Sequence, residues 1–420
     1  MLLRLLYTFG VRAYGLAIRL AAVLNPKAKT WVKGRQNWRG DWQKIRSNPN
    51  ERWVWFHCAS LGEFEQGRNL IDEIKSRHPE LKVLITFFSP SGYTIRQNYR
   101  YADAVLYLPL DTPAAAMFMV NALRPELVFW IKYELWINTL RELQKRNIPV
   151  LLVSARMDAS SNFLKGPLAP LYRSVLQGMA HIFTQDKSTR ELLSEVVDRK
   201  KVSVSSDTRF DRVNSNYEGW AARPEIEAFI GGRLCIMGGS VWPKGEALLH
   251  QAFSELRAAH DVCMILAPHN IHSDQIEKWR SQYPDITHRY SEGGSQAEGK
   301  SILWIDNIGM LSQLYHYADV AYVGGGWGTG LHNILEPAAF GCPILFGPKH
   351  QQFPEAEDLI RAGGAWVIQD ATELTTQLKR LISSGAERDK VRRINQGFIQ
   401  ERTGATELIL DWCQMNGLFG

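Results

Sequence analysis

The sequence predicts an α/β protein with two doubly wound, Rossmann-like domains that face a central cleft. The length of 420 residues exceeds one ordinary core and suits two domains of roughly 150–200 residues each. Short apolar runs alternate with helical periodicity over most of the chain, which is typical of parallel sheets covered on both faces. A stretch rich in Asn, Gly and Pro at 213–232 interrupts this alternation near the middle.

The segment 1–46 is basic and is expected to associate with a membrane. It holds ten Lys and Arg residues and a single acid, Asp41, while the rest of the chain is slightly acidic. A basic arm on a mildly acidic body indicates binding to an anionic surface rather than a general affinity for nucleic acid. We therefore expect anionic membrane lipids, and no nucleic acid, among the partners.

Residues 1–24 predict a helix that lies in the membrane interface. Arg4, Arg12 and Arg19 interrupt the apolar sequence, so no run reaches the ~18–20 residues that a span requires. On a helix these arginines fall within about 80° of one another. The pattern indicates arginines at the lipid headgroups and the remaining face in the acyl region. The alternative is a helix that packs on the protein's own body.

A first domain is expected over 47–212, with helical stretches between most of its strands. The predicted strands are Trp53–Ala59, Val83–Phe88, Ala104–Leu108, Leu127–Ile131, Val150–Val153, His181–Thr184 and Val202–Ser205.

A linker is expected at 213–232, and a second domain over 233–400. Its predicted strands are Leu234–Met237, Val262–Ala267, Ser301–Ile305, Val320–Val323, Pro343–Phe346 and Ala365–Ile368. Helical periodicity covers Ala371–Ser384 and Ala386–Leu410, and the segment 401–420 is expected to pack as a helix on the first domain.

The five cysteines favour a reducing, cytoplasmic compartment. They are scattered, and none forms a CxxC pair or a Cys/His cluster at metal-ligand spacing. The chain also lacks a GxxxxGK[ST] P-loop and a convincing DxD pair. We therefore expect no metal site and no P-loop NTPase activity.

Doubly wound domains bind ligands beyond the carboxyl ends of their strands. In the second domain Gly324–Gly326 permit close approach of the backbone to a ligand. A helix is expected to begin within His332–Pro337, where its free N–H groups suit a phosphate or ribose. Asn333 can cap this helix, and Glu336 can accept from ribose hydroxyls or close a capping box. The alternative is that the glycines only shape a turn.

Three further turns of the second domain are candidate ligand contacts. Ser240 and Glu246 follow its first strand, and Pro268-His269 follows its second. Ile308-Gly309-Met310 opens another helix, whose backbone could read a base. Taken singly, a Pro-His pair after a strand is more often an ordinary turn.

The first domain carries candidate acid/base groups. Glu63 stands at the start of the helix after its first strand, and Glu134 follows strand Leu127–Ile131. A carboxylate there can take a proton from a hydroxyl as general base. The alternative for Glu63 is a first-turn carboxylate that stabilises its own helix.

Two arginines that follow later strands are candidates for binding a sugar carboxylate or phosphate. They are Arg156 and Arg209. Either could equally form a surface ion pair, Arg156 with Asp158 and Arg209 with Asp211.

These turns resemble those of the 3-deoxy-D-manno-octulosonic acid (Kdo) transferases of lipopolysaccharide biosynthesis, which are two-domain, GT-B type glycosyltransferases. Phe56–Glu63 is similar to the family's H-x-x-S-x-G-E motif, Tyr133–Trp136 to its E-L-W-P motif, and Thr208–Asp211 to its K-F-D segment. The segments similar to those that hold CMP in the family are Pro268-His269, Ile308-Gly309-Met310 and Asn333-Ile334-Leu335-Glu336.

The sequence departs from the family pattern at a few positions. Arg209 stands where the family has Lys, Lys132 where a second acid is common, and Ile137 where the E-L-W-P motif has Pro. Leu331 replaces a usual Gly, and the turn Ser240–Glu246 is one residue longer than the common S-T-H-x-G-E. The two carboxylates and the H-N-x-L-E turn are retained.

The resemblance implies inverting transfer of Kdo from CMP-Kdo to the 6′-hydroxyl of a lipid A precursor, lipid IVA. It implies that Glu63 is the general base and that Glu134 and Arg209 act at the transition state. Ser240, Glu246, Arg156 and His332 are further candidate substrate contacts. The reaction is expected to need no cofactor and no metal, and to take place at the cytoplasmic face of the bacterial inner membrane.

Two alternatives remain at this stage. One is another sugar-nucleotide enzyme of the same architecture, such as a UDP-N-acetylglucosamine 2-epimerase, which would have no use for a membrane anchor. The other is a membrane-bound protein that binds a sugar nucleotide without catalysis. Release of CMP rather than UDP separates the first from a Kdo transferase, and a turnover assay separates the second.

Overall fold

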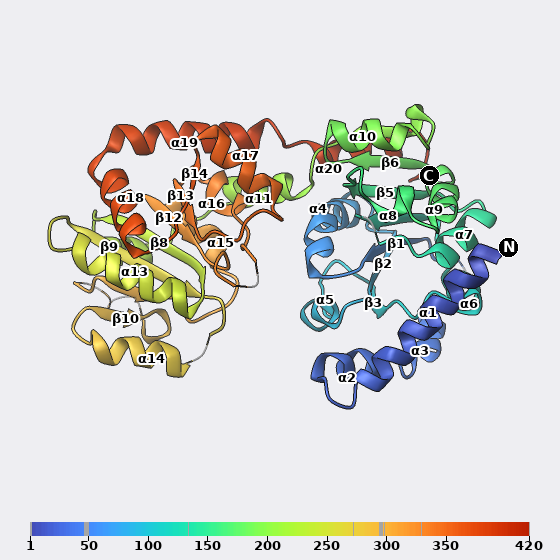
Figure 1. The fold of residues 1–420 in the computed structure, drawn as a ribbon, viewed down its shortest axis with the longest axis horizontal. Helices are drawn as coiled ribbons and strands as arrows, with labels where there is room; N and C mark the ends of the chain where they lie inside the picture. Colours follow the sequence, from blue (N-terminus) through green and yellow to red (C-terminus); the bar gives the residue numbers. More distant parts are fainter. Residues whose placement is uncertain are drawn as a thin grey trace. The chain divides into compact units, whose positions relative to one another are not determined.

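The chain folds into two compact units (Figure 1). The N-terminal unit comprises Met1–Asp211 with Thr403–Gly420, and the C-terminal unit comprises Arg212–Arg402. The computed structural model describes residues 2–45, 50–132, 134–271, 273–293, 297, 299–328 and 330–419. Arg46 of the basic segment and Tyr133 of the motif Tyr133–Trp136 lie outside the described residues.

The N-terminal unit contains a parallel sheet with strand order β3-β2-β1-β4-β5-β6-β7. Its strands are β1 Trp53–Cys58, β2 Lys82–Phe87, β3 Ala104–Tyr107, β4 Leu127–Ile131, β5 Val150–Ala155, β6 His181–Thr184 and β7 Val202–Val204. Strands β2 and β3 extend the sheet on one side of β1, and β4 to β7 on the other. The topological switch point, where ligands of such sheets bind, therefore lies between β1 and β4.

Helices surround this sheet and lead into it from the N-terminus. They are α1 Leu2–Ala21, α2 Pro26–Lys33, α3 Trp38–Lys44, α4 Leu61–Arg77, α5 Pro90–Arg96, α6 Pro113–Leu123, α7 Ile137–Lys145, α8 Asn162–Lys165, α9 Ala169–Gln177, α10 Lys187–Ser194, the 3-10 turn Arg199–Lys201 and α20 Ala405–Met415.

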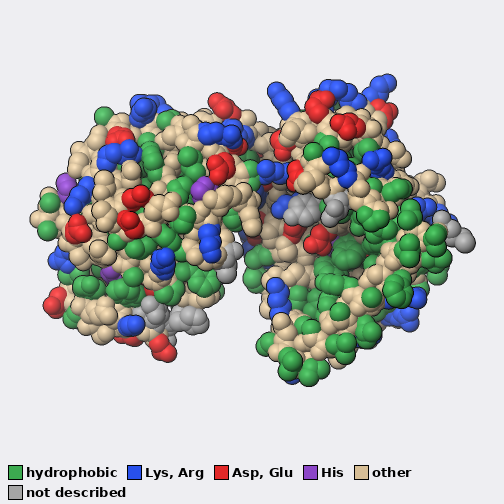
Figure 2. All heavy atoms as spheres, viewed as in Figure 1, with side chains coloured by type: hydrophobic (Ala, Val, Ile, Leu, Met, Phe, Trp, Pro, Cys, Tyr) green, Lys and Arg blue, Asp and Glu red, His purple; other side chains and the backbone are tan. Residues whose placement is uncertain are grey.

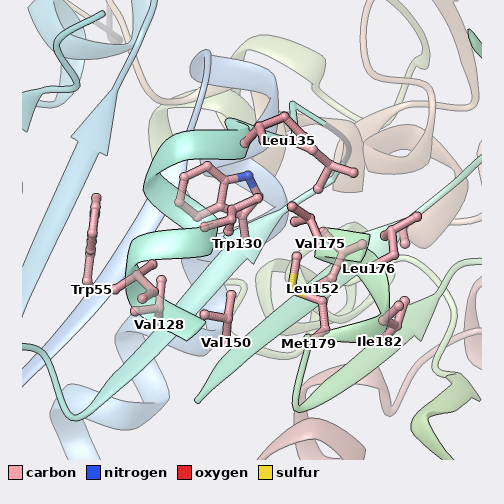
Figure 3. Close-up of a cluster of buried hydrophobic side chains, with 14 of the residues drawn as sticks. Trp55, Val128, Trp130, Leu135, Val150, Leu152, Val175, Leu176, Met179 and Ile182 are labelled. Atoms are coloured by element: carbon pink, nitrogen blue, oxygen red, sulfur yellow. The ribbon is translucent and has the colours of Figure 1, made fainter. Parts of the chain in front are cut away.

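The central strands are buried on both faces, which explains their continuous apolar sequences. Every residue of β1 and β4 is buried. Because side chains alternate along a strand, Trp55 and Trp130 enter the core on one face (Figure 3), with ring centroids 6.1 Å apart. Phe56 and Phe129 stack 4.6 Å apart on the other face.

Helix α1 uses one face to pack on the N-terminal unit. Tyr7, Thr8, Val11 and Gly15 are buried, and the Tyr7 hydroxyl donates to Asp111 at 2.8 Å. Packing on the protein's own body, the alternative to membrane contact, is therefore correct for this face. The expectation that all three arginines point to headgroups is wrong for Arg4, because its Nε donates to Asn138 Oδ1 at 2.7 Å.

The opposite face of α1 exposes large apolar side chains. Figure 2 shows hydrophobic side chains gathered on the N-terminal unit over α1 and α2. The exposed residues of the α1 apolar face are Leu2, Leu5, Leu6, Phe9, Leu16 and Leu20. Val23 and Leu24, just beyond the helix, are 82% and 92% exposed. No described helix is long and apolar enough to cross a membrane.

The C-terminal unit contains a second parallel sheet, with strand order β10-β11-β9-β8-β12-β13-β14. Its strands are β8 Leu234–Val241, β9 Val262–Pro268, β10 Thr287–Arg289, β11 Ile302–Trp304, β12 Val320–Val323, β13 Ile344–Phe346 and β14 Ala365–Val367. Strand β8 takes the place of β1, so the switch point of this sheet lies between β8 and β12.

The helices of the C-terminal unit include two that were expected to be linker. The helices are α11 Arg209–Glu218, whose first residues belong to the N-terminal unit, α12 Pro224–Ile230, α13 Pro243–Leu256, α14 Ser273–Gln282, α15 Leu311–Leu314, α16 Leu335–Ala339, α17 Pro354–Ala362, α18 Ala371–Ser383 and α19 Gly385–Gln400, with 3-10 turns at Tyr290–Glu292 and Tyr315–Tyr317. The prediction of a linker at 213–232 is wrong, because α11 and α12 occupy most of it. Ile226 and Phe229 of α12 are fully buried in the core of this unit.

The predicted strands agree with the observed ones to within a few residues, with one omission. Strand β10 is three residues long and was not predicted, because so short a run carries little periodicity. The tail expected to be helical over Ala386–Leu410 breaks after α19, near Gly404, whose φ of 98° suits glycine. Helix α20 then packs on the N-terminal unit, as expected for 401–420.

Candidate active site

In the N-terminal unit, Glu63 and Glu134 follow the two strands that flank the switch point. Glu63 lies in the first turn of α4, is 9% exposed, and accepts a hydrogen bond from the Ser60 hydroxyl. Burial raises the pKa of Glu134 to about 7, and the charge of Glu63 contributes to the rise. The two carboxyl groups therefore interact electrostatically at the carboxyl edge of the sheet.

Buried side chains fix the backbone beneath these carboxylates. The Trp130 Nε1–H donates to the backbone carbonyl of Glu134 at 2.8 Å. His57 packs against Trp130, with ring centroids 4.3 Å apart, and its Nδ1 lies 2.9 Å from Thr86 Oγ1. Burial lowers the pKa of His57 to about 3, so this ring is neutral. His57 is therefore part of the buried packing beneath the two carboxylates.

Arg209, at the start of α11, is linked through the carboxylate of Asp207 to α4, the helix that carries Glu63. Arg209 Nη2 and Nε lie 2.9 and 3.1 Å from Asp207 Oδ2, and Gln66 of α4 donates to the same oxygen at 3.0 Å. Burial alone would raise the pKa of Asp207, but Arg209 and the hydrogen bonds outweigh it and lower the pKa. The ion pair expected with Asp211 is replaced by one with Asp207.

Asp211 and Arg156 have other partners. Asp211 accepts from the backbone amides of Gly404 and Thr406 and from the Thr406 hydroxyl, each at 2.6 Å, and so holds the start of α20. Arg156 lies 3.9 Å from Asp186, and its side chain is 41% exposed. The structure thus connects Arg209, but not Arg156, to the helix that carries Glu63.

In the C-terminal unit, glycines bring two backbones together at the switch point. A Cβ on Gly324 would lie 2.0 Å from the carbonyl oxygen of Ser240, and Gly325 has a φ of 95°. Both positions therefore require glycine. The glycines thus permit a close approach of two segments of the protein's own backbone, and their approach to a ligand stays a prediction.

A stack of three rings joins three of the predicted turns. Trp242 stacks on His269 with ring centroids 4.3 Å apart, and His269 stacks on His332 at 4.5 Å. The Trp242 Nε1–H donates to Nε2 of His332 at 3.1 Å. Burial, with His269 nearby, lowers the pKa of His332 to about 4. His332 is therefore neutral, and its remaining proton is on Nδ1.

Beside this ring stack lies a crevice of about 260 Å³ between the β8–α13 turn and the loop after β12. Its walls include Trp242, Tyr322 and Trp327, and the Trp327 Nε1–H donates to the Tyr322 hydroxyl at 2.7 Å. Lys244 Nζ lies 4.1 Å from the centroid of Trp327. Such a crevice suits a ligand with a flat or apolar face and a negative charge.

The H-N-x-L-E turn leads into a very short helix. Helix α16 begins at Leu335, within the expected segment His332–Pro337, and spans five residues. Asn333 accepts from the backbone amide of Leu335 at 3.2 Å, as expected of a capping side chain, and its amide donates to Glu336 Oε1 at 3.1 Å. Asn333 and Glu336 thus orient each other, and Ile334 and Leu335 are buried beneath them.

The other predicted contacts of this unit differ in accessibility. Ile308 is 93% exposed, Gly309 has a φ of 99°, and Met310 is buried. Glu246 is 2% exposed and accepts from the Trp279 Nε1–H at 3.1 Å, so it is tied to α14. Glu246 is thus buried and bonded to α14, and its contact with a substrate stays a prediction.

Sequence reasoning did not single out Gln66, Asp207, Trp327 or the stacking of Trp242. The signal for Trp242 and Trp327 was present, because both follow strands at the switch point. The role of Asp207 depends on a partner on a distant helix and had no local signal. Among the residues that the structure describes, no group of three His, Cys, Asp or Glu side chains is arranged to hold a metal ion.

Comparison with known proteins confirms the resemblance that the motifs indicated. Residues 36–212 match the family described as 3-deoxy-D-manno-octulosonic-acid transferase (Kdo transferase). A 3-deoxy-D-manno-octulosonic acid transferase of Haemophilus influenzae is 25% identical over 94% of this chain and 93% of its own length. One of Aquifex aeolicus is 25% identical over 83% of this chain and 92% of its own.

The fold is also that of known two-domain sugar-nucleotide proteins. A UDP-GlcNAc 2-epimerase of Neisseria meningitidis, solved with UDP-GlcNAc bound, superimposes with a TM-score of 0.62 over 86% of this chain and 98% of its own. Its sequence is only 14% identical, so it shows the fold alone. The predicted GT-B type architecture of two doubly wound domains is thereby confirmed.

Proposed function

The chain is a relative of the Kdo transferases, and from this premise we propose that it is an inverting glycosyltransferase that moves Kdo from CMP-Kdo to the 6′-hydroxyl of lipid IVA. The observation that carries the proposal is the pair Glu63 and Glu134 at the switch point of the N-terminal sheet. The similarity spans nearly the whole chain, and the pair lies in the two segments that resemble the family's acidic motifs.

Glu63 acts as the general base in this proposal. It takes the proton from the acceptor hydroxyl as that oxygen attacks the anomeric carbon of Kdo, and the bond from this carbon to the phosphate of CMP breaks. Positive charge grows on the sugar and negative charge on the departing phosphate. Glu134 and Arg209 stabilise these charges, and the ion pair with Asp207 holds Arg209 in one orientation.

The C-terminal unit holds the donor. The neutral ring of His332 presents an Nδ1–H donor, and Asn333 and Glu336 present polar groups that suit ribose hydroxyls. Pro268-His269, Ile308-Gly309-Met310 and Ile334-Leu335 complete the CMP site in the manner of the family motif. Ser240 and the nearby crevice accommodate the parts of the donor beyond the nucleotide.

The enzyme binds the cytoplasmic face of the inner membrane through α1. The α1 apolar face enters the interface, and Arg12 and Arg19 at its margin meet anionic headgroups. Since the other face packs on the N-terminal unit, α1 positions the acceptor-binding unit at the source of a lipid substrate. The exposure of Leu2, Leu5 and Phe9 supports this arrangement.

A direct assay tests the proposal. Purified protein is incubated with CMP-Kdo and tetraacylated lipid IVA, and the lipid product is weighed by mass spectrometry. We expect CMP release and a product heavier by one or more Kdo units. A lipid of unchanged mass in the presence of intact donor would refute the transferase assignment.

Because the fold is similar to that of a UDP-GlcNAc 2-epimerase, 2-epimerase activity is the alternative function. A 2-epimerase would act on UDP-N-acetylglucosamine without any lipid. The same assay with this nucleotide sugar decides between them, because the proposal predicts no UDP-dependent turnover.

The proposal involves no metal ion. The leaving group is a nucleoside monophosphate, and N–H groups and histidine of the C-terminal unit can stabilise its charge. We expect initial rates in excess EDTA within about twofold of those without it, whereas a metal-dependent enzyme would lose nearly all activity.

A further inference from the structure

Helix α7, which begins just after Glu134, is capped by side chains from other segments of the N-terminal unit. It starts at Ile137, and the side chain of its N-cap residue, Trp136, makes no capping hydrogen bond. The first backbone N–H groups of a helix have no partner within the helix. Groups outside α7 must therefore bind them, and in this chain they come from α1 and from the loop before α6.

A buried carboxylate and a tyrosine hydroxyl bind these N–H groups. Asp111 accepts from the backbone amides of Asn138 at 2.7 Å and of Thr139 at 2.8 Å. The amide of Ile137 donates to the Tyr7 hydroxyl at 3.3 Å, and this hydroxyl donates to Asp111 at 2.8 Å. Asp111 and Tyr7 thus cap the first turn of α7 together.

The cap is shielded from water, and its two groups are in the states that it requires. Asp111 is fully buried, and Tyr7 is buried beside it. Burial and the nearby charge of Asp111 raise the pKa of Tyr7, so the hydroxyl stays protonated and can donate. Hydrogen bonds in such surroundings are stronger than exposed ones, and losing a partner costs more.

Two more hydrogen bonds connect α1 to the same turn. Arg4 Nε donates to Asn138 Oδ1 at 2.7 Å, and the side-chain amide of Asn138 donates to the Thr8 hydroxyl at 3.3 Å. Arg4, Tyr7 and Thr8 lie on one face of α1, because residues three and four apart are neighbours on a helix. Three side chains from this face therefore hold the start of α7.

A stack of rings also connects α1 to the segment that follows Glu134. The ring centroid of Trp136 lies 4.6 Å from that of Phe88, and Tyr14 of α1 stacks on Phe88 at 6.3 Å. Arg35, which is buried, donates to the backbone carbonyl of Phe88 at 2.6 Å. Burial and the charge of Glu134 raise the pKa of Tyr14, so these two side chains interact electrostatically.

We propose that Tyr7 is a positioning residue for Glu134, and that α1 supports the catalytic carboxylates in addition to its contact with the membrane. The inference rests on the proposed function, because it assigns a buried residue of α1 to the reaction proposed above. Without the Tyr7 hydroxyl, the N–H of Ile137 is unpaired and Asp111 loses a donor. The first turn of α7 then relaxes, and the carboxylate of Glu134 loses its fixed position.

The first test measures initial rates of the full chain in neutral detergent micelles with CMP-Kdo and lipid IVA. Tyr7→Phe removes only the hydroxyl and should lower kcat about tenfold, while both KM values change by less than about twofold. This pattern is that of a group whose position matters at the transition state and not for binding. A wild-type kcat in folded Tyr7→Phe would overturn the proposal.

Val11→Ala separates positioning from a general loss of stability. Val11 is buried on the face of α1 that packs on the N-terminal unit, and its apolar side chain takes no part in the cap of α7. Its truncation should lower the melting temperature about as much as Tyr7→Phe does and leave kcat within about twofold of wild type. An equal fall in kcat in both variants would show that Tyr7 acts through stability alone, and would overturn the proposal.

Arg4→Met tests the same connection from the surface of α1. It removes the hydrogen bond to Asn138 and should lower kcat about threefold in micelles. Lys145→Met, which removes an exposed cation at the other end of α7, is the matched control and should leave kcat unchanged. Should Tyr7→Phe fail to fold, a wild-type kcat in Arg4→Met would overturn the proposal.

A measurement without turnover separates failure of this inference from failure of the proposed function. Melting temperatures at pH 5 and pH 8 are compared for wild type, Tyr7→Phe, Glu134→Gln and the double variant. This cycle removes the separate effect of Tyr7→Phe on Asp111. Glu63 of α4 and Tyr14 of α1, which interact with Glu134, are present in all four proteins.

The expected result is a coupling between the two substitutions. The pH-dependent shift in melting temperature that Glu134→Gln removes should be smaller in the Tyr7→Phe background, because a carboxyl released from its buried position regains an ordinary pKa. Such a coupling would support the inference even if wild type made no Kdo product. A shift of the same size in both backgrounds would overturn it, even if Kdo transfer were demonstrated.

Discussion

In each sheet the order of successive strands reverses at one switch point, which lies between β1 and β4 in the N-terminal sheet and between β8 and β12 in the C-terminal sheet. At the first switch point the chain places two carboxylates, Glu63 and Glu134. At the second it places glycines, a tryptophan and histidines, among them Gly324, Trp242 and His332. One topology thus presents two carboxylates at the switch point of one unit, and glycines with neutral ring side chains at that of the other. The fold decides where a ligand meets the chain, and the residues after the strands decide what can happen there.

The largest expected effect concerns the switch point of the N-terminal sheet, where Glu63 and Glu134 lie. Glu63→Gln should lower kcat by about 10²–10⁴-fold, because the amide cannot accept the proton of the acceptor hydroxyl. CMP binding to the C-terminal unit should be unchanged, and initial rates and equilibrium CMP binding measure the two quantities. Glu73→Gln, on the exposed side of the same helix, is the control and should retain full activity. Retained kcat in Glu63→Gln would break the division of roles between the two units.

The raised pKa of Glu134 predicts a pH-dependent stability in the N-terminal unit. Its pKa rises from 4.5 to about 7 on folding, because burial and the charge of Glu63 disfavour the ionised form. Between these values the native state binds more protons than the unfolded state, so its stability falls as pH rises. The loss relative to Glu134→Gln should reach up to about 3 kcal/mol. Melting temperatures of both proteins at pH 5 and pH 8 measure it, and parallel shifts would contradict it.

A third test uses the two faces of α1, a feature of the N-terminal unit. Phe9→Asp should reduce partition into anionic vesicles by about tenfold or more, because a side chain exposed in water would no longer enter the lipid. Its melting temperature should not change. Gly15→Val should instead lower the melting temperature, since a Cβ there would lie 2.2 Å from a methyl of Leu110. Unchanged vesicle binding by Phe9→Asp would exclude the apolar face as the anchor.

The smallest expected effect concerns the switch point of the C-terminal sheet, between β8 and β12. Trp242→Phe keeps a ring against His269 but removes the donor that fixes the proton of His332 on Nδ1. The KM for CMP-Kdo should rise about 2–10-fold without a change in kcat. Trp366→Phe, which alters a tryptophan that contacts Arg380 elsewhere in the same unit, is the control. A fall in kcat alone would show that this unit takes part in the chemistry.

Most strands were predictable because they are buried on both faces, so their sequences are continuous apolar runs. β4, β6 and β12 match their predicted bounds. Helices α11 and α12 were mistaken for a linker, because Asn, Gly and Pro mark helix ends as well as loops. The burial of α12 depends on Ile226 and Phe229, and two apolar residues are too few for a clear periodicity.

The residues of the candidate site also divide into those that the sequence could predict and those that it could not. Glu63, Glu134 and the H-N-x-L-E turn could be found because they directly follow strands. The link from Arg209 through Asp207 to Gln66 could not, because it joins a turn and a helix that are far apart in sequence. Glu246 was a candidate substrate contact because it follows a strand, and its hydrogen bond with Trp279 had no local signal because Trp279 is 33 residues away.

By itself the sequence determined the two doubly wound domains, the basic amphipathic N-terminus and the carboxylates and glycines after the strands. These features arise from local periodicity and from residue types whose chemistry does not depend on distant partners. Only the tertiary structure decided which face of α1 is free, which carboxylate Arg209 meets, and that Arg35 is buried without a carboxylate partner among the described residues. Those outcomes depend on burial and on contacts between distant segments. Burial strengthens the electrostatic interactions of a charged side chain and raises the free-energy cost of leaving it unpaired.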